Sequence, residues 1–143
     1  MASCKYKLPE EFLRKLSMLG GETDRITEEV LQAGGEVVLA KAKSNLSSVL
    51  SGNSSGELLS ALGMSGILQD RNGNSNIKIG FSEPRKDGTS NALVANVLEY
   101  GKHNQPPRPF MAPAKKQSKN ECINTMINKL EEEIKKLWRY LKN

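Results

Sequence analysis

The sequence has few of the residues from which metal centres are built. Its 143 residues include only two cysteines, Cys4 and Cys122, and one histidine, His103. No CxxC pair occurs, so a zinc site would have too few soft ligands. We expect both cysteines to stay reduced, with Cys122 as a small core residue on an apolar helical stripe. The sequence therefore predicts no metal site.

Long apolar runs and export signals are also missing. The mean hydropathy is -0.51, and no apolar run reaches the ~18 residues of a membrane-spanning helix. The first seven residues contain no apolar core of a secretory signal. We therefore expect a soluble protein of the cytoplasm in which it is made, without a membrane partner.

Catalytic and nucleotide-binding motifs are lacking as well. The chain contains no GxSxG, no GxxxxGK[ST] and no GxGxxG after a strand. A lone loop histidine such as His103 is typical of a surface residue, and Glu131 and Glu132 are spaced to pair with Lys135 and Lys136 on a helix surface. We expect no enzyme and no cofactor. A small ribonuclease that works with Lys, Arg and Tyr alone stays open as an alternative.

Positive charge is present in excess and is unevenly distributed. The net charge is +5, and residues 101–120 contain no acid. Their basic residues are Lys102, Arg108, Lys115, Lys116 and Lys119. Lysines in such a cluster can contact DNA or an acidic protein surface, although a solvated face fits equally well. A small basic nucleic-acid-binding protein is therefore the alternative function, despite only 5% aromatic residues and no helix-turn-helix or RNA-binding motif.

Hydrophobic periodicity and turn signals predict an α+β fold with a small antiparallel sheet. A β-hairpin is expected to pack against a long helix in the N-terminal half and a long C-terminal helix, in one domain over residues 1–143. The expected elements are a helix from Pro9 to Leu19 stopped by Gly20-Gly21, a long helix from about Thr23 to Leu50, a helical turn at 57–62, strands at 64–69 and 76–81 joined through Asn72-Gly73, and a helix at 91–100 ended by Gly101.

Two features of the long helices carry further expectations. Gly34-Gly35 interrupts the first, and we expect a bend or a close contact there instead of a break. The second begins near Pro113 and runs to about Leu141. Its expected seam, which we place against the sheet and the other long helix, consists of Ile123, Ile127, Leu130, Ile134, Leu137 and Leu141, widened by Met126 and Trp138.

The segment Gln105–Phe110 differs from the rest because it contains three prolines. Prolines forbid helix and favour an extended chain, so the entropy of ordering is already reduced. A stiff arm that presents Arg108 and Phe110 suits docking on another protein. A rigid linker into the final helix is the simpler interpretation, and both can hold.

The block Val97-Leu98-Glu99-Tyr100-Gly101, followed by the residues from Pro106 to Ala114, resembles a family of tailed-phage minor structural proteins. Its members are tail-completion, neck or head–tail joining proteins of HK97-type siphophages. The glycine-then-leucine turn at 56–62 and the long final helix extend the resemblance over roughly residues 10–141.

This resemblance implies a virion component without a catalytic site. Such proteins act as rings or ring-bound adaptors in the neck or at the top of the tail, so the implied partners are copies of the chain and other neck and tail proteins. We expect Phe110 to dock into a neighbour and Lys102, Lys115, Lys116 and Lys119 to face DNA or an acidic protein. The expected interaction residues are Glu99, Tyr100, Gly101, Arg108, Pro109 and Phe110.

Overall fold

The computed structural model describes residues 4–6, 10, 22–50 and 55–142 of the chain. In chain order the elements are β1 (Cys4–Tyr6), α2 (Thr23–Val49), α3 (Glu57–Ala61), β2 (Leu62–Met64), β3 (Leu68–Gln69), β4 (Ser75–Phe81), α4 (Asn91–Tyr100) and α5 (Met111–Lys142). The expected helix from Pro9 to Leu19 and its glycine stop lie outside the described residues, apart from Glu10. The α+β class predicted from the sequence is confirmed.

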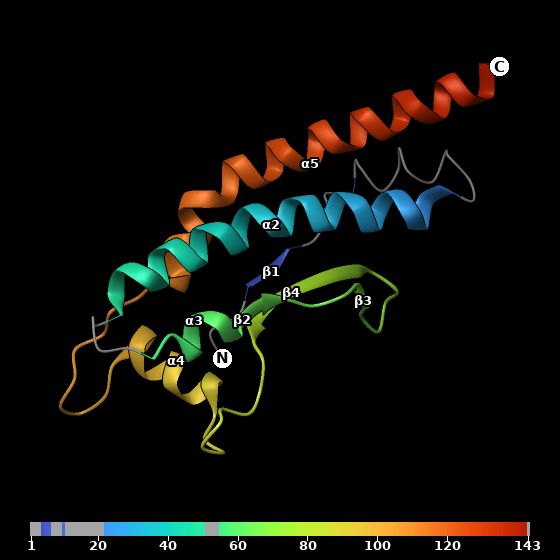
Figure 1. The fold of residues 1–143 in the computed structure, drawn as a ribbon. Helices are drawn as coiled ribbons and strands as arrows, with labels where there is room; N and C mark the ends of the chain where they lie inside the picture. Colours follow the sequence, from blue (N-terminus) through green and yellow to red (C-terminus); the bar gives the residue numbers. More distant parts are fainter. Residues whose placement is uncertain (1–3, 7–9, 11–21, 51–54, 143) are drawn as a thin grey trace.

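The elements form layers in which α2 is central. Figure 1 shows α5 along one side of α2 and the small sheet on the other. The two long helices run antiparallel, because Asn45 near the end of α2 contacts Gln117 near the start of α5, whereas Arg25 near the start of α2 contacts Glu133. We expected α5 to pack on the sheet as well as on α2, but α2 lies between them.

The sheet is built around β4, with which each of the other three strands pairs antiparallel. The single strand expected over residues 64–69 is divided into β2 and β3. The predicted hairpin turn is confirmed: the Asp70 carboxylate accepts the N–H groups of Asn72 at 2.8 Å and Asn74 at 2.9 Å, and Gly73 adopts a φ of 80°.

Gly34-Gly35 lies inside an unbroken α2, so the expectation of a close contact is confirmed. A Cβ atom on Gly34 would lie 2.6 Å from both Cγ and Sδ of Met126 in α5. A Cβ on Gly35 would collide with the sulfur of Met64 and lie 3.3 Å from Cγ2 of Ile77, both in the sheet. The two glycines therefore let α5 and the sheet approach α2 from different sides.

The seam of α5 agrees with the expected one at Met126 and Leu130 and differs elsewhere. Its buried residues are Met111, Ala114, Ser118, Cys122, Met126, Leu130 and Glu133. The expected Ile123 and Ile127 are only half-buried, and Trp138 is 61% exposed. Periodicity placed the seam on the largest apolar residues, but the glycines of α2 accept Met126, and the Ser118 hydroxyl is satisfied by donating to the Ala114 carbonyl at 2.6 Å. Cys122 is buried, as expected.

Candidate interaction site

The candidate site is the segment Tyr100–Pro109, called here the proline loop, which joins α4 to α5. Gly101 ends α4 with a φ of 77°, and a Cβ there would lie 2.7 Å from the carbonyl oxygen of Gln105. Lys102 and Gln105 then exchange two backbone hydrogen bonds of 2.9 and 3.0 Å. The segment is therefore a tight bridged turn followed by Pro106–Pro109, which have no regular structure. Figure 1 shows it projecting beyond the ends of the helices.

Glu99 closes the base of the proline loop. Its side chain is buried, and its carboxylate accepts the N–H groups of Phe110, Met111 and Ala112, each at 2.9 Å. These amides belong to the start of α5, where helical N–H groups lack intrahelical partners and the helix dipole favours a negative charge. Glu99 thus joins the last turn of α4 to the first turn of α5 and is not itself on the surface.

Phe110 is completely buried in the core of its own chain. Its ring packs edge-on against Phe81 of β4, with centroids 6.1 Å apart and an interplanar angle of 81°. We predicted that Phe110 docks into a neighbouring subunit, but here it has no exposed surface with which to do so. The chain turns into α5 directly after Pro109, and this turn points the ring inward.

The remaining predicted residues stay at the surface. Tyr100 is 69% exposed, Arg108 and Pro109 are exposed, and Gly101 is half-buried. Arg108 also fixes the loop, because its N–H donates to the Leu98 carbonyl at 2.7 Å and its guanidinium donates to the Val49 carbonyl at 3.1 Å. The second bond places a cation at the C-terminal end of α2, where the helix dipole favours it.

A small groove of about 290 Å³ opens beside the loop, between the end of α2, α3 and α4. Most of its lining is apolar. Arg108 lies at its edge together with Arg85, which donates to Asn91 at 3.2 Å and pairs with Glu57 at 3.7 Å. The apolar lining residues are Val49, Leu50, Leu58, Val94, Val97 and Leu98.

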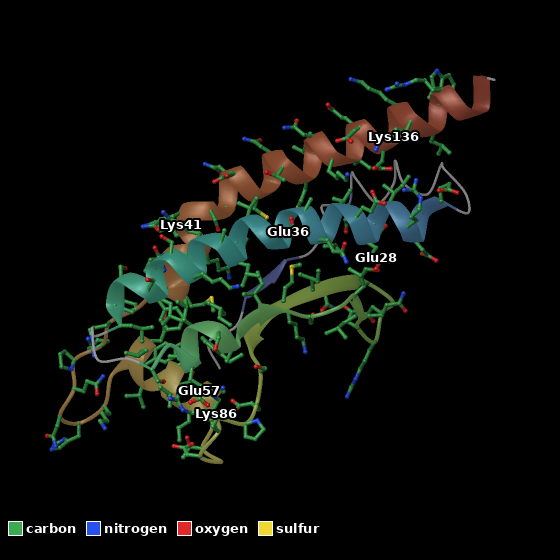
Figure 2. All side chains as sticks on the ribbon, in the orientation of Figure 1. Glu28, Glu36, Lys41, Glu57, Lys86 and Lys136 are labelled. Carbon is green, nitrogen blue, oxygen red and sulfur yellow. The ribbon has the colours of Figure 1, made fainter. Side chains whose placement is uncertain are left out.

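The predicted lysines are exposed at the same end of the molecule. Lys102 lies in the proline loop, and Lys115, Lys116 and Lys119 lie on the first turns of α5. Sequence reasoning missed Lys41 of α2, which Figure 2 labels one helical turn before Asn45. The absence of acids from residues 37–56 is a signal that could have found it.

A second cluster of charges lies at the opposite end of the α2–α5 pair, around buried Glu133. Its carboxylate lies 3.1 Å from the Arg25 guanidinium and 3.4 Å from the amino groups of Lys129 and Lys136. Burial by itself would raise the pKa of Glu133, but the hydrogen bonds donated by Arg25 and Lys136 and the positive charge of Lys136 favour the ionised form, and its pKa is lowered to about 2. The charged residues of this cluster line an open groove of about 790 Å³. In this cluster the positive and negative side chains form ion pairs with one another.

The described residues lack two kinds of feature. Across residues 4–6, 10, 22–50 and 55–142, no group of three or more His, Cys, Asp or Glu side chains is placed to hold a metal ion. Within the same ranges, none of the helices combines the length and the apolar character needed to cross a membrane.

Comparison with known proteins identifies a family. Residues 10–101 match the family model described as "Bacteriophage HK97-gp10, putative tail-component". No curated protein and no solved structure matches the chain. The match includes Glu99, Tyr100 and Gly101 but ends before the prolines and α5. Because it spans well over half of the 143 residues, the chain belongs to the HK97-gp10-like family of phage tail components.

Proposed function

We propose that this tail component acts at the head–tail junction or at the top of the tail, as a ring subunit or adaptor that contacts other neck and tail proteins. It is made and assembled in the host cytoplasm and remains in the virion. The observation that carries the proposal is the proline loop. This loop projects from the body, and hydrogen bonds within it and at its base fix its conformation.

The proline loop suits a partner protein because little of it would have to be ordered on binding. Gly101, the Lys102–Gln105 bridge and the carboxylate of Glu99 fix its path. A surface that is rigid beforehand binds with a smaller entropy cost. Tyr100, 69% exposed at the base of the loop, supplies the kind of aromatic side chain that dominates many protein interfaces.

Deletion of the gene from the source phage or induced prophage, followed by electron microscopy of the lysate, tests the position in the virion. We expect separate filled heads and separate tails. Intact, infectious particles without this protein would contradict the proposal.

Complementation of the deletion with two single variants tests the loop itself. Tyr100→Ser removes the exposed ring at the base of the loop, and Leu93→Ser is the matched control, because Leu93 is 62% exposed on the same helix. The free energy of unfolding of both variants should stay within about 0.5 kcal/mol of the wild-type value, as is usual for surface substitutions. We expect only Tyr100→Ser to lower the yield of infectious particles. Equal yields from the two variants would remove Tyr100 from the interface.

A further inference from the structure

The α2–α5 pair has one end that carries positive charge alone. Residues 37–50 of α2 and 111–120 of α5, called here the basic end, contain no aspartate and no glutamate. They contain five exposed lysines, namely Lys41, Lys43, Lys115, Lys116 and Lys119.

The two stretches lie together in the fold. The side-chain amide of Asn45 donates to the carbonyl of Phe110 and to the side chain of Gln117, each at 3.3 Å. Figure 2 labels Lys41 on the part of α2 that precedes Asn45 by one helical turn. On α5, Lys115 and Lys119 are four residues apart and therefore share one face of the helix.

Nothing within the described residues of the molecule neutralises these lysines. No ion pair joins any of them to a described acid, whereas Lys129 and Lys136 farther along α5 pair with Glu29, Glu132 and Glu133. Glu36 and Glu121 flank the two stretches, but neither forms an ion pair with these lysines within the described residues. Glu99 is buried against the backbone amides of α5. The positive charges of the basic end therefore face solvent, where an external anion can reach them.

The other exposed side chains of the basic end indicate the chemistry of its partner. Ser47, Ser48, Gln117 and Asn120 accompany the lysines at the surface. Hydroxyl, amide and amino groups are those that contact phosphate oxygens of nucleic acid. Of the exposed large apolar residues of the described chain, Leu68, Leu93 and Trp138 lie elsewhere, and Tyr100 lies at the base of the proline loop, outside these two stretches. A protein partner would need an apolar anchor of this kind, and the basic end offers none.

We propose that the basic end binds the phosphate backbone of duplex DNA without reading its sequence. The lysines displace counterions from the duplex, and this release drives binding and makes it steeply salt-dependent. The proposal rests on the charge distribution and does not depend on where in the virion the protein is placed.

A matched pair of charge reversals on one helix tests this proposal. Lys115→Glu/Lys119→Glu alters the basic end, and Lys135→Glu/Arg139→Glu alters exposed residues near the other end of α5 with the same change in net charge. The measurement is fluorescence anisotropy of a labelled duplex of ~30 base pairs at several NaCl concentrations from ~50 to ~200 mM. Thermal unfolding of each variant shows that it is folded.

For Lys115→Glu/Lys119→Glu we expect at least about a tenfold loss of affinity and a salt slope smaller by about 2, since each lost phosphate contact removes ~0.9 from the slope. The control should retain most of the wild-type affinity and slope. Equal losses in both variants would show that net charge alone acts and would overturn the proposal. So would failure of the wild type to bind at ~50 mM salt. Displacement of the duplex by polyglutamate at equal charge would identify an acidic protein as the partner instead.

Discussion

The two ends of the α2–α5 pair are held together by different means. At the basic end, the lysines remain in solvent, and the contacts are made by the amide of Asn45 together with two neighbouring residues outside that end, the buried Phe110 ring and the Glu99 carboxylate. At the other end, called here the ion-paired end, the cations of Arg25 and Lys136 surround Glu133. Charges that pair within the chain contribute to stability, and charges that are left outside are available to a partner.

Phe110→Ala gives the largest expected change and tests the basic end. Deleting a fully buried ring should lower the free energy of unfolding by about 3–5 kcal/mol. Urea unfolding followed by circular dichroism measures it. Tyr100→Ala removes an exposed aromatic nearby and should stay within about 0.5 kcal/mol of wild type. A Phe110→Ala protein as stable as wild type would contradict the burial of the Phe110 ring in the core.

Glu99→Ala is expected to rank second, because it removes the acceptor of three amides at the start of α5. We expect a loss of about 2–3 kcal/mol in the free energy of unfolding, together with faster hydrogen exchange at Phe110, Met111 and Ala112. Glu99→Gln keeps one carbonyl acceptor and should fall between Ala and wild type. If exchange at these amides did not change, Glu99 would not be their main acceptor.

Glu133→Gln tests the ion-paired end and should depend on pH. The pKa of Glu133 is lowered from 4.5 to about 2, so its stabilisation is present above pH 4.5 and is lost as pH falls toward 2. Because Arg25 and Lys136 are about half exposed, we expect a loss of only about 1–2 kcal/mol at pH 7. The difference from wild type should disappear near pH 2. Exposed Glu121, changed to Gln, should show no such trend, and a constant difference for Glu133→Gln would exclude a charge effect.

Glu132→Gln gives the smallest expected change and sharpens the contrast within the ion-paired end. Glu132 pairs with Lys136 at 3.2 Å, but both side chains are 55% exposed. An exposed pair one helical turn apart contributes about 0.3–0.5 kcal/mol. Chemical unfolding should detect a loss no greater than this. A loss as large as that of Glu133→Gln would mean that burial does not separate the two carboxylates.

The elements that the sequence predicts best are those with local signals. The hairpin follows from Asn72-Gly73, and α4 ends at Gly101, where the φ of 77° favours glycine. The close contact at Gly34-Gly35 was also foreseeable, because two glycines inside an apolar helical pattern need a packing reason.

The environment of the predicted site residues was harder to foresee. The partners of Glu99 are backbone amides more than ten residues later, and a backbone amide has no sequence signature. Phe110 was expected outside because prolines suggest an exposed arm, although an aromatic residue directly before a long helix can equally turn into the core. Glu133 was one of three consecutive glutamates, and only the antiparallel packing of α5 against Arg25 distinguishes it.

The glycine pair of α2 also determines how the layers can move. The Met126 side chain packs where a Cβ atom of Gly34 would lie, and the Met64 side chain packs where a Cβ atom of Gly35 would lie. If α5 or the sheet slid along α2 by one turn, larger side chains of α2 would meet these methionines. A shear motion of the packed layers is therefore opposed on both sides of α2.

The 27 residues of α2 span about 40 Å. The helix therefore acts as a rigid spacer that keeps the basic end and the ion-paired end at a constant separation.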